Sequence, residues 1–299
     1  MGFLFKSKKN NASSASQNLK TGKVISFLNQ KGGVGKTTMC FNSAHALARQ
    51  GARVLCIDMD PQANLSLLFN CELGDEEHSI FHLLVNSIRE LKNIHTPTHV
   101  NEIIRTHPSG IDILPSSQEL SGFELTVSGV STSRPLILKN YLQKSGLIHQ
   151  YDYIIIDCPP TLGLLVVNTL CATDGVMVPF RPDEFSKKGL GHLYSVLGDI
   201  EEMGVGEAPK VIAHIPNLMD NRRKQEQEEL ESISGELVED LGEEHACVVD
   251  PFFNRAQLVR SGGQRKSVFD YQSKEFQGLQ HQFNELASII KESDYGHRG

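Results

Sequence analysis

Residues 29–38 read Asn-Gln-Lys-Gly-Gly-Val-Gly-Lys-Thr-Thr, a glycine-rich stretch that carries two lysines. Glycines let backbone N–H groups approach phosphate oxygens, and a helix that begins behind them directs its positive end at the same anion. Lys36 and Thr37 stand where the P-loop pattern has its phosphate-binding lysine and its Mg²⁺-binding hydroxyl. The first glycine of the strict pattern is replaced by Gln30, so this loop is a variant. We expect the additional Lys31 to serve a second nucleotide, held by a partner subunit.

The loop lies between a predicted strand and a predicted helix. Residues 24–28 are a short apolar run, residues 37–50 place apolar side chains on one helical face, and residues 53–58 form a second apolar run. Near-continuous apolar strands are typical of parallel sheets that are covered on both faces. We therefore predict an α/β fold of the P-loop NTPase class, with a mostly parallel twisted sheet flanked by helices on both faces. Further strands are expected at residues 111–114, 153–156, 175–178 and 211–215.

The remaining segments complete one folded domain, predicted at 23–299. Residues 72–108 read as a weaker helical region, and the very acidic residues 222–245 as a surface helix. Residues 273–292 carry one apolar stripe and are expected to form the last helix. The polar residues 1–22 are predicted to be a disordered basic tail, which is either a solvated leader or an arm that touches DNA or a partner.

Composition narrows the functional class. The chain has 299 residues, 39% of them hydrophobic, and a formal net charge of −7, which argues against a uniformly basic nucleic-acid binder but leaves room for a local basic patch. The six cysteines show no CxxC spacing, so reduced and mostly buried thiols are expected. No apolar run approaches the roughly 18 residues that span a membrane, and no signal peptide is evident, so we expect a cytosolic protein.

Acidic residues close two of the predicted strands. Asp157 ends the apolar run at 153–156, where a carboxylate holds Mg²⁺ through water in P-loop enzymes. Asp58 and Asp60 follow the second strand, and a carboxylate there can position an attacking water. Each aspartate alone is also explained as a cap or a turn residue. Because parallel strands end at one edge of the sheet, these acids together with the glycine loop predict a nucleotide site.

Four motifs resemble one family in particular. The sequence is similar to the ParA/MinD group of deviant Walker-type ATPases, and more closely to the ParA partition ATPases, over about residues 23–292. The resemblance rests on residues 30–38, 58–62, 113–117 and 155–160, which read QKGGVGKTT, DMDPQ, ILPSS and IIDCPP. Additional landmarks lie at residues 178–180, 184–190 and 267–271.

This resemblance implies an ATPase with weak intrinsic turnover that uses ATP and Mg²⁺ and closes into a face-to-face homodimer. Lys31 would reach the phosphates bound by the other subunit and act in catalysis with Lys36 and Asp60, the latter orienting the hydrolytic water. Thr37 and Asp157 would serve the metal, and Asn217 would lie near the adenine. The loop residues implied in ATP binding are Gly32, Gly33, Val34, Gly35, Lys36, Thr37 and Thr38.

The resemblance also implies that the ATP dimer binds DNA without sequence preference. Basic residues in the C-terminal half are the candidates, although each of them singly is equally well explained as a solvated surface charge. The cluster between 255 and 266 has four cations and no acid. The candidate residues are Lys187, Lys188, Arg255, Arg260, Arg265 and Lys266.

The implied function is a nucleoid-associated, cytoplasmic positioning switch of bacterial type. It would partition a cargo, which is a plasmid, a chromosome region or a protein assembly, and a ParB-like or cargo-adaptor protein would stimulate hydrolysis. The 22 residues before the domain are too few for a helix-turn-helix repressor domain, and the acidic end at 291–294 argues against a membrane helix. Two alternatives stay open: a membrane-associated regulator of the MinD or flagellar-number type, supported by the apolar residues 3–5, and a metabolic iron–sulfur carrier or reductase component, which the missing CxxC disfavours.

Overall fold

A central sheet organises the chain. The computed structural model describes residues 21–74, 76–92, 98–220, 222–242, 246–254, 256–293 and 295. Within these residues one seven-stranded sheet has the order β3-β4-β2-β5-β1-β6-β7, parallel throughout except for the antiparallel pair of β3 and β4. The strands are β1 (Lys23–Phe27), β2 (Val54–Asp58), β3 (Arg105–Thr106), β4 (Asp112–Leu114), β5 (Tyr153–Asp157), β6 (Gly175–Phe180) and β7 (Lys210–Pro216).

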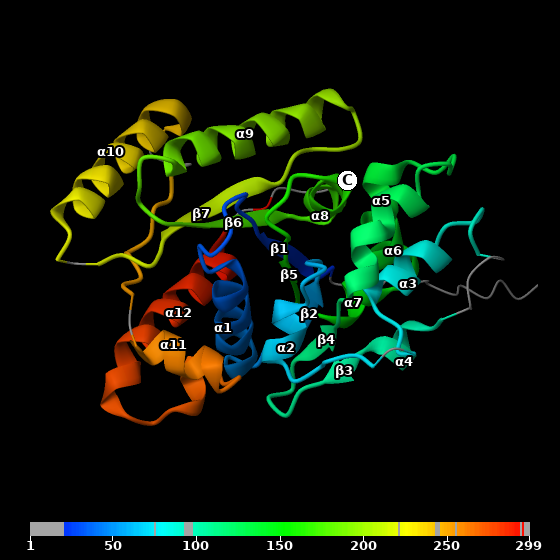
Figure 1. The fold of residues 1–299 in the computed structure, drawn as a ribbon, viewed down its shortest axis with the longest axis horizontal. Coiled ribbons are helices and arrows are strands. Elements are labelled where there is room, and N and C mark those ends of the chain that lie inside the picture. The colour runs from blue at the N-terminus through cyan, green and yellow to red at the C-terminus, as the bar shows by residue number, and fades with distance from the viewer. Residues whose placement is uncertain are drawn as a thin grey trace, which may run out of the picture.

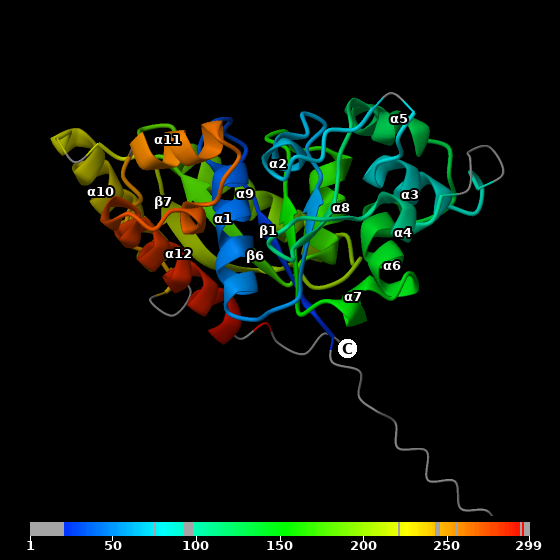
Figure 2. The ribbon, with the colours of Figure 1, turned by 90° about the horizontal axis from the view of Figure 1, so that it is seen from below.

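Helices cover both faces of this sheet (Figures 1 and 2). One face is covered by α1 (Lys36–Arg49), α2 (Asn64–Leu68), α11 (Ala256–Gly263) and α12 (Lys274–Glu292). The opposite face packs against α3 (Ile80–Asn86), α5 (Phe123–Thr126), α6 (Ile137–Lys144), α8 (Leu164–Ala172), α9 (Ser186–Glu202) and α10 (Lys224–Leu241). The short helices α4 (Val100–Ile103) and α7 (Leu147–Gln150) lie in connections.

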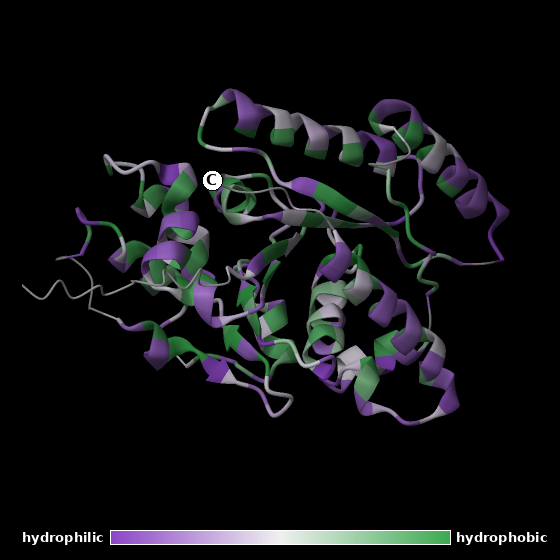
Figure 3. Cartoon of the chain, turned by 180° about the vertical axis from the view of Figure 1, so that it is seen from behind, coloured by the Kyte–Doolittle hydropathy of each residue, from purple (hydrophilic) through white to green (hydrophobic). Residues whose placement is uncertain are grey.

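The central strands are apolar at nearly every position because successive side chains enter different cores. Ile154 and Ile156 of β5 belong to the core under α8, whereas Ile155 between them belongs to the core under α1 and α12. Side chains alternate across a strand, so a strand that is buried on both faces must be apolar at every position. Figure 3 shows the same distribution, with hydrophobic central strands and largely hydrophilic outer turns on α10.

The expected elements are confirmed, and the structure contains further ones, such as α8 and α9. The predicted strands and helices occur within a few residues of their expected bounds, and the acidic segment forms α10. The region 72–108 holds helices α3 and α4 but also the two-residue edge strand β3, which sequence periodicity did not predict. Nearly all of the predicted basic tail, residues 1–20, lies outside the described residues. In the described part of the chain, no helix combines the length and the apolar character needed to cross a bilayer.

A buried amide fastens the C-terminal segment to the helix that follows the glycine loop. The Oδ1 atom of Asn42 in α1 accepts hydrogen bonds from Val268 N (2.9 Å) and Ser267 Oγ (3.1 Å), and its Nδ2 donates to Thr38 O (3.0 Å). Asn42 and Ser267 are both almost completely buried. Loss of this amide would leave a buried N–H and a buried hydroxyl without their acceptor.

Replacement of Asn42 by alanine is therefore expected to lower the free energy of unfolding by about 2–3 kcal/mol, since unsatisfied buried donors are costly. Urea denaturation followed by circular dichroism measures this change. The matched control is Asn284→Ala, which removes an exposed hydrogen bond from Gln50 and should change stability by no more than about 0.5 kcal/mol. Equal effects of the two substitutions would contradict a clamping role for Asn42.

Candidate functional site

The glycine loop follows β1, and the sheet order decides what surrounds it. Strand β1 lies between β5 and β6, and Phe27 at its end is in register with Asp157, which is in turn in register with Asp58 of β2. These strands are parallel, so the loop and the two aspartates meet at the carboxyl edge of the sheet. Crevices at this edge are the usual ligand sites of open α/β sheets.

Two glycines give the loop its shape. Gly33 and Gly35 adopt left-handed φ values of 72° and 93°, which residues with a Cβ atom rarely adopt. Gly35 has a second constraint, because a Cβ atom there would lie 2.3 Å from Nδ2 of Asn217. That amide donates to the carbonyl of Val34 at 2.7 Å, so it fastens the segment after β7 to the loop. Helix α1 begins at Lys36, directly behind Gly35.

Asn29 holds the head of the loop. Its Nδ2 donates to the carbonyl of Pro179 in β6 (2.9 Å), and its Oδ1 accepts from the backbone N–H of Lys31 (2.8 Å). Inside the loop, the Nζ of Lys36 donates to the carbonyl of Lys31 at 3.3 Å. The loop is thus bent around the Lys36 ammonium, which is the arrangement that a phosphate group would bind.

Asp157 and Thr37 are bonded to each other beside the glycine loop. The Thr37 hydroxyl donates to Oδ2 of Asp157 at 2.6 Å. The other oxygen, Oδ1, is buried and has no hydrogen-bond partner among the described residues. A threonine hydroxyl and an adjacent carboxylate with a free oxygen fit a hydrated Mg²⁺ ion, which prefers oxygen ligands and retains several waters.

The two acids after β2 have different surroundings. Asp58 is completely buried, and its oxygens accept from Asp60 N (3.1 Å), Ser66 N (2.8 Å) and Ser66 Oγ (2.7 Å). Ser66 Oγ in turn accepts from Ser116 N (3.0 Å), so Asp58 joins three segments and has a structural role. Asp60 instead lines the cavity beside the glycine loop. Of the two predicted acids, only Asp60 is placed to contact a bound ligand.

Burial dominates the electrostatics of this edge. Desolvation raises the pKa of the Asp157 carboxyl well above its ordinary value, and the neighbouring Asp58 raises it further, although Thr37 and Lys36 act in the opposite direction. Desolvation likewise raises the pKa of Asp58 to about 6 and lowers that of Lys36. Burial thus favours the uncharged form of both carboxyls, and a divalent cation bound beside Asp157 would favour its ionised form and offset the cost of burying that charge.

A cavity of about 570 Å³ extends from the glycine loop along the carboxyl edge of the sheet. Its polar wall contains most of the residues predicted to bind nucleotide, and its other wall is apolar. Val34 differs from its neighbours because its side chain is buried. The lining residues are Gly32, Gly33, Gly35, Lys36, Thr37, Thr38, Asp60, Gln62, Asn64, Leu67, Leu68, Pro160, Asn217, Leu218, Leu258 and Val259.

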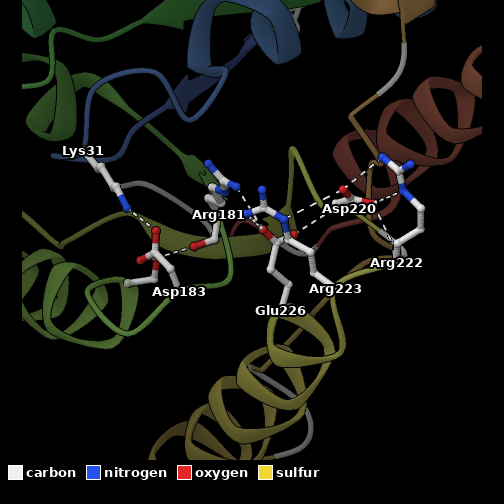
Figure 4. Close-up of polar contacts among 8 residues, drawn as sticks. Lys31, Arg181, Asp183, Asp220, Arg222, Arg223 and Glu226 are labelled. Atoms are coloured by element: carbon white, nitrogen blue, oxygen red, sulfur yellow. Dashed lines mark hydrogen bonds and ion pairs between the residues drawn. The ribbon is translucent and has the colours of Figure 1, made fainter.

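Lys31 reaches away from its own loop. Its ammonium forms an ion pair with Oδ2 of Asp183, in the connection between β6 and α9 (Figure 4). The same ammonium lies 5.9 Å from the ring centre of Phe185. Asp183 was not among the residues predicted from the sequence. The available signal was its position three residues after β6, the strand beside β1, because acids at that edge face the loop.

The predicted DNA-binding residues occupy two regions. Lys187 and Lys188 lie in the first turn of α9, and Arg260 lies in α11, followed by Arg265 and Lys266. Three of them are paired with carboxylates: Lys187 with Glu236, Arg260 with Glu275 at 2.5 Å, and Arg265 with Glu72 at 2.7 Å. Lys188 and Lys266 are exposed. The remaining candidate, Arg255, lies outside the described residues.

Sequence reasoning missed Asp183 and also several residues of the cavity wall. The apolar wall of Leu67, Leu68, Leu218, Leu258 and Val259 comes from three separate segments of the chain. Leu218 has a left-handed φ of 59°, an uncommon conformation for leucine that turns the chain directly after Asn217. No short motif links these segments, because they meet only in the folded sheet.

Comparisons with known proteins agree with this geometry. The model of an AAA domain family matches residues 22–207. The chain is 38% identical over 176 residues to the sporulation initiation inhibitor protein Soj of Bacillus subtilis, covering 59% of this chain and 65% of that protein. It is 30% identical over 253 residues to the chromosome partitioning protein ParA of Myxococcus xanthus, covering 85% of this chain and 83% of that protein. The chain thus spans slightly less than two thirds of the Soj relative.

A solved structure provides a further comparison. Cobyrinic acid a,c-diamide synthase from Mycobacterium smegmatis, determined with a bound ATP analogue and magnesium, has a TM-score of 0.71 and 26% sequence identity. The match covers 90% of this chain and 94% of that one. The fold is thus one that holds a magnesium nucleotide in a relative. Given the matched AAA domain, the ParA relative and the P-loop with its Thr37–Asp157 pair, the chain belongs to the ParA/Soj family of partition ATPases.

Proposed function

We propose that this protein is an ATP-dependent dimerising switch, which hydrolyses ATP slowly and binds DNA without sequence preference while it positions a cargo. The observation that carries the proposal is that the two lysines of the glycine loop extend in different directions. Lys36 points into the loop and contacts the carbonyl of Lys31, whereas the Lys31 side chain extends outward to Asp183. One lysine is therefore available for the subunit's own nucleotide and the other for a second subunit.

In this proposal the glycine loop binds the phosphates of ATP. Lys36 and the backbone N–H groups at the start of α1 neutralise the phosphate oxygens. Asn217, whose Oδ1 is buried and has no partner among the described residues, accepts a hydrogen bond from the base. Thr37 and Asp157 hold Mg²⁺, which when bound screens the charge of the β- and γ-phosphate oxygens.

Asp60 is the residue that we assign to the attacking water. It lines the cavity, and its Oδ1 accepts from the backbone N–H of Gln62 at 2.9 Å, which leaves the second oxygen to orient a water. Asp58 supports it from behind by accepting the N–H of Asp60. Hydrolysis would end the dimeric state, and a ParB-like or cargo-adaptor protein would accelerate it.

The DNA-bound state would rest on cations outside the nucleotide site. Lys188 and Lys266 are the strongest candidates in the described part of the chain, since neither has a carboxylate partner there. Contacts of lysine with phosphate give affinity without sequence preference. Relatives named for chromosome partitioning support DNA as the surface on which this dimer works, and hence a cytoplasmic, nucleoid-associated location.

Substitution of Lys31 by alanine is expected to weaken ATP-dependent dimerisation at least tenfold while leaving ATP binding by the monomer within about twofold. The reason is that Lys31 would contact only the nucleotide of the other subunit. Sedimentation velocity with and without ATP measures the first effect, and equilibrium titration with a fluorescent ATP analogue measures the second. Lys224→Ala, which removes a highly exposed lysine of α10, serves as the control. A Lys31→Ala protein that dimerises normally would disprove the proposed role.

Substitution of Asp60 by alanine should retain the ATP dimer and lower the rate of phosphate release by about 10²-fold, the usual loss when a proton-accepting group is removed. A phosphate-release assay under DNA-saturated conditions tests this expectation. The control, Asp199→Ala, changes an exposed acid on α9 and should turn over ATP like the unmodified protein. Normal turnover by the Asp60 variant would exclude this residue as the water-positioning group.

The double variant Lys188→Ala/Lys266→Ala should bind random-sequence duplex DNA more weakly and with a less steep salt dependence. Each lost phosphate contact reduces the slope of log K against log[salt] by about 0.9, so a decrease of about one to two is expected. Fluorescence anisotropy of the ATP-bound protein at several salt concentrations provides the slopes. An unchanged slope would show that these two lysines do not contact DNA.

A further inference from the structure

The ion pair between Lys31 and Asp183 connects two loops of the same subunit at the carboxyl edge of the sheet. Lys31 belongs to the loop after β1, and Asp183 to the connection that follows the neighbouring strand β6. Both side chains are partly exposed, at 40% and 29%, so the contact lies at the surface, next to Gly32 of the cavity wall, where a second copy of the chain can reach it. Figure 4 shows the Lys31 side chain extended toward this carboxylate.

Asp183 is held in place from its own side. Its Oδ1 accepts from the backbone N–H of Phe185 (3.1 Å) and from Ser186 Oγ (3.0 Å), at the start of α9. These bonds use the oxygen that does not contact Lys31. The carboxylate therefore does not depend on the lysine for its orientation, and it remains a fixed acceptor if the lysine leaves.

The connection that carries Asp183 is also anchored to the rest of the fold. Arg181, two residues earlier, forms an ion pair with Glu226 of α10 at 2.9 Å, and the second oxygen of Glu226 accepts from the backbone N–H of Asp220 at 2.7 Å. Glu226 is buried, whereas the Arg181 side chain is 39% exposed, so this anchor lies at the boundary between core and solvent. Figure 4 shows the anchor beside the Lys31–Asp183 pair. The position of Asp183 is thus set before any ligand arrives.

A phosphate in another subunit would have to compete with this carboxylate for the Lys31 ammonium. The backbone of Lys31 is fastened through Asn29, so its side chain must move when it changes acceptor. A carboxylate and a phosphate compete for the same three N–H donors. The intramolecular pair is therefore an alternative to the contact across the dimer.

We propose that Asp183 is an intramolecular competitor that holds Lys31 in its own subunit until the nucleotide of a second copy replaces the carboxylate. This inference rests on the proposed function, because it presupposes that Lys31 acts across a dimer. Asp183 then sets the ATP concentration at which the dimer forms. Partly exposed ion pairs contribute little individually, so the expected effect is about two- to fivefold.

The first experiment measures the ATP concentration for half-maximal dimerisation by sedimentation velocity. Asp183→Asn keeps the shape and the acceptor oxygen but removes the charge, and it should lower this concentration about two- to fivefold. Asp183→Glu restores the charge and should return the value toward that of the unmodified protein. The control is Glu77→Gln, which removes the similarly exposed 3.0 Å pair with Arg105 (46% and 39% exposed) and should have no effect. An unchanged or increased concentration for Asp183→Asn overturns the proposal.

A second experiment tests the ion pair without nucleotide or dimer. The nucleotide-free protein is treated with a limiting amount of an acetylating reagent, and modification of Lys31 is quantified by mass spectrometry relative to Lys224. Lys31 should react about two- to fivefold faster in Asp183→Asn than in the unmodified protein, because its amino group is then no longer held against a carboxylate and is more accessible to the reagent. Equal reactivity overturns the proposal. Faster reaction combined with no ATP-dependent dimer in any variant would instead refute the proposed function and leave the ion pair established.

Discussion

The register of three parallel strands is the constraint on which the site depends. Phe27, Asp157 and Asp58 end their strands side by side, so the glycine loop and two carboxylates must share one edge of the sheet. A shift of β5 by one residue would turn Asp157 to the other face, because side chains alternate along a strand. The apolar side chains of β5, which fill both cores, prevent that shift. Packing far from the nucleotide cavity therefore fixes the Thr37–Asp157 contact.

That edge contains more buried charge than a stable core tolerates without compensation. Asp58 is stabilised locally by hydrogen bonds from the hydroxyl and the N–H of Ser66, which also join β2 to α2. Asp157 has only one hydrogen-bonded oxygen among the described residues. The two carboxylates therefore differ in the free oxygen that Asp157 retains, although both end apolar strands with the same local pattern.

The sequence predicted the fold and most of the polar wall of the cavity, because both depend on short-range patterns. Strand–loop–helix order, apolar runs and the glycine spacing are visible within about 20 residues. Strand β3 was missed because two residues have no periodicity. The pairing of Lys31 with Asp183, 152 positions apart, depends on β1 and β6 being neighbours, which only the strand order reveals. The apolar wall was missed for the same reason.

The segment after residue 207 lies beyond the matched AAA domain, yet it contains β7, α11 and α12. Asn217 from this segment touches the glycine loop, and Ser267 and Val268 bond to Asn42 in the first helix. The two parts of the gene therefore encode interlocking halves of one site. Recombination near residue 207 between two distant relatives would bring together side chains that had not evolved in contact with each other. Selection would therefore preserve the two halves as a single hereditary unit.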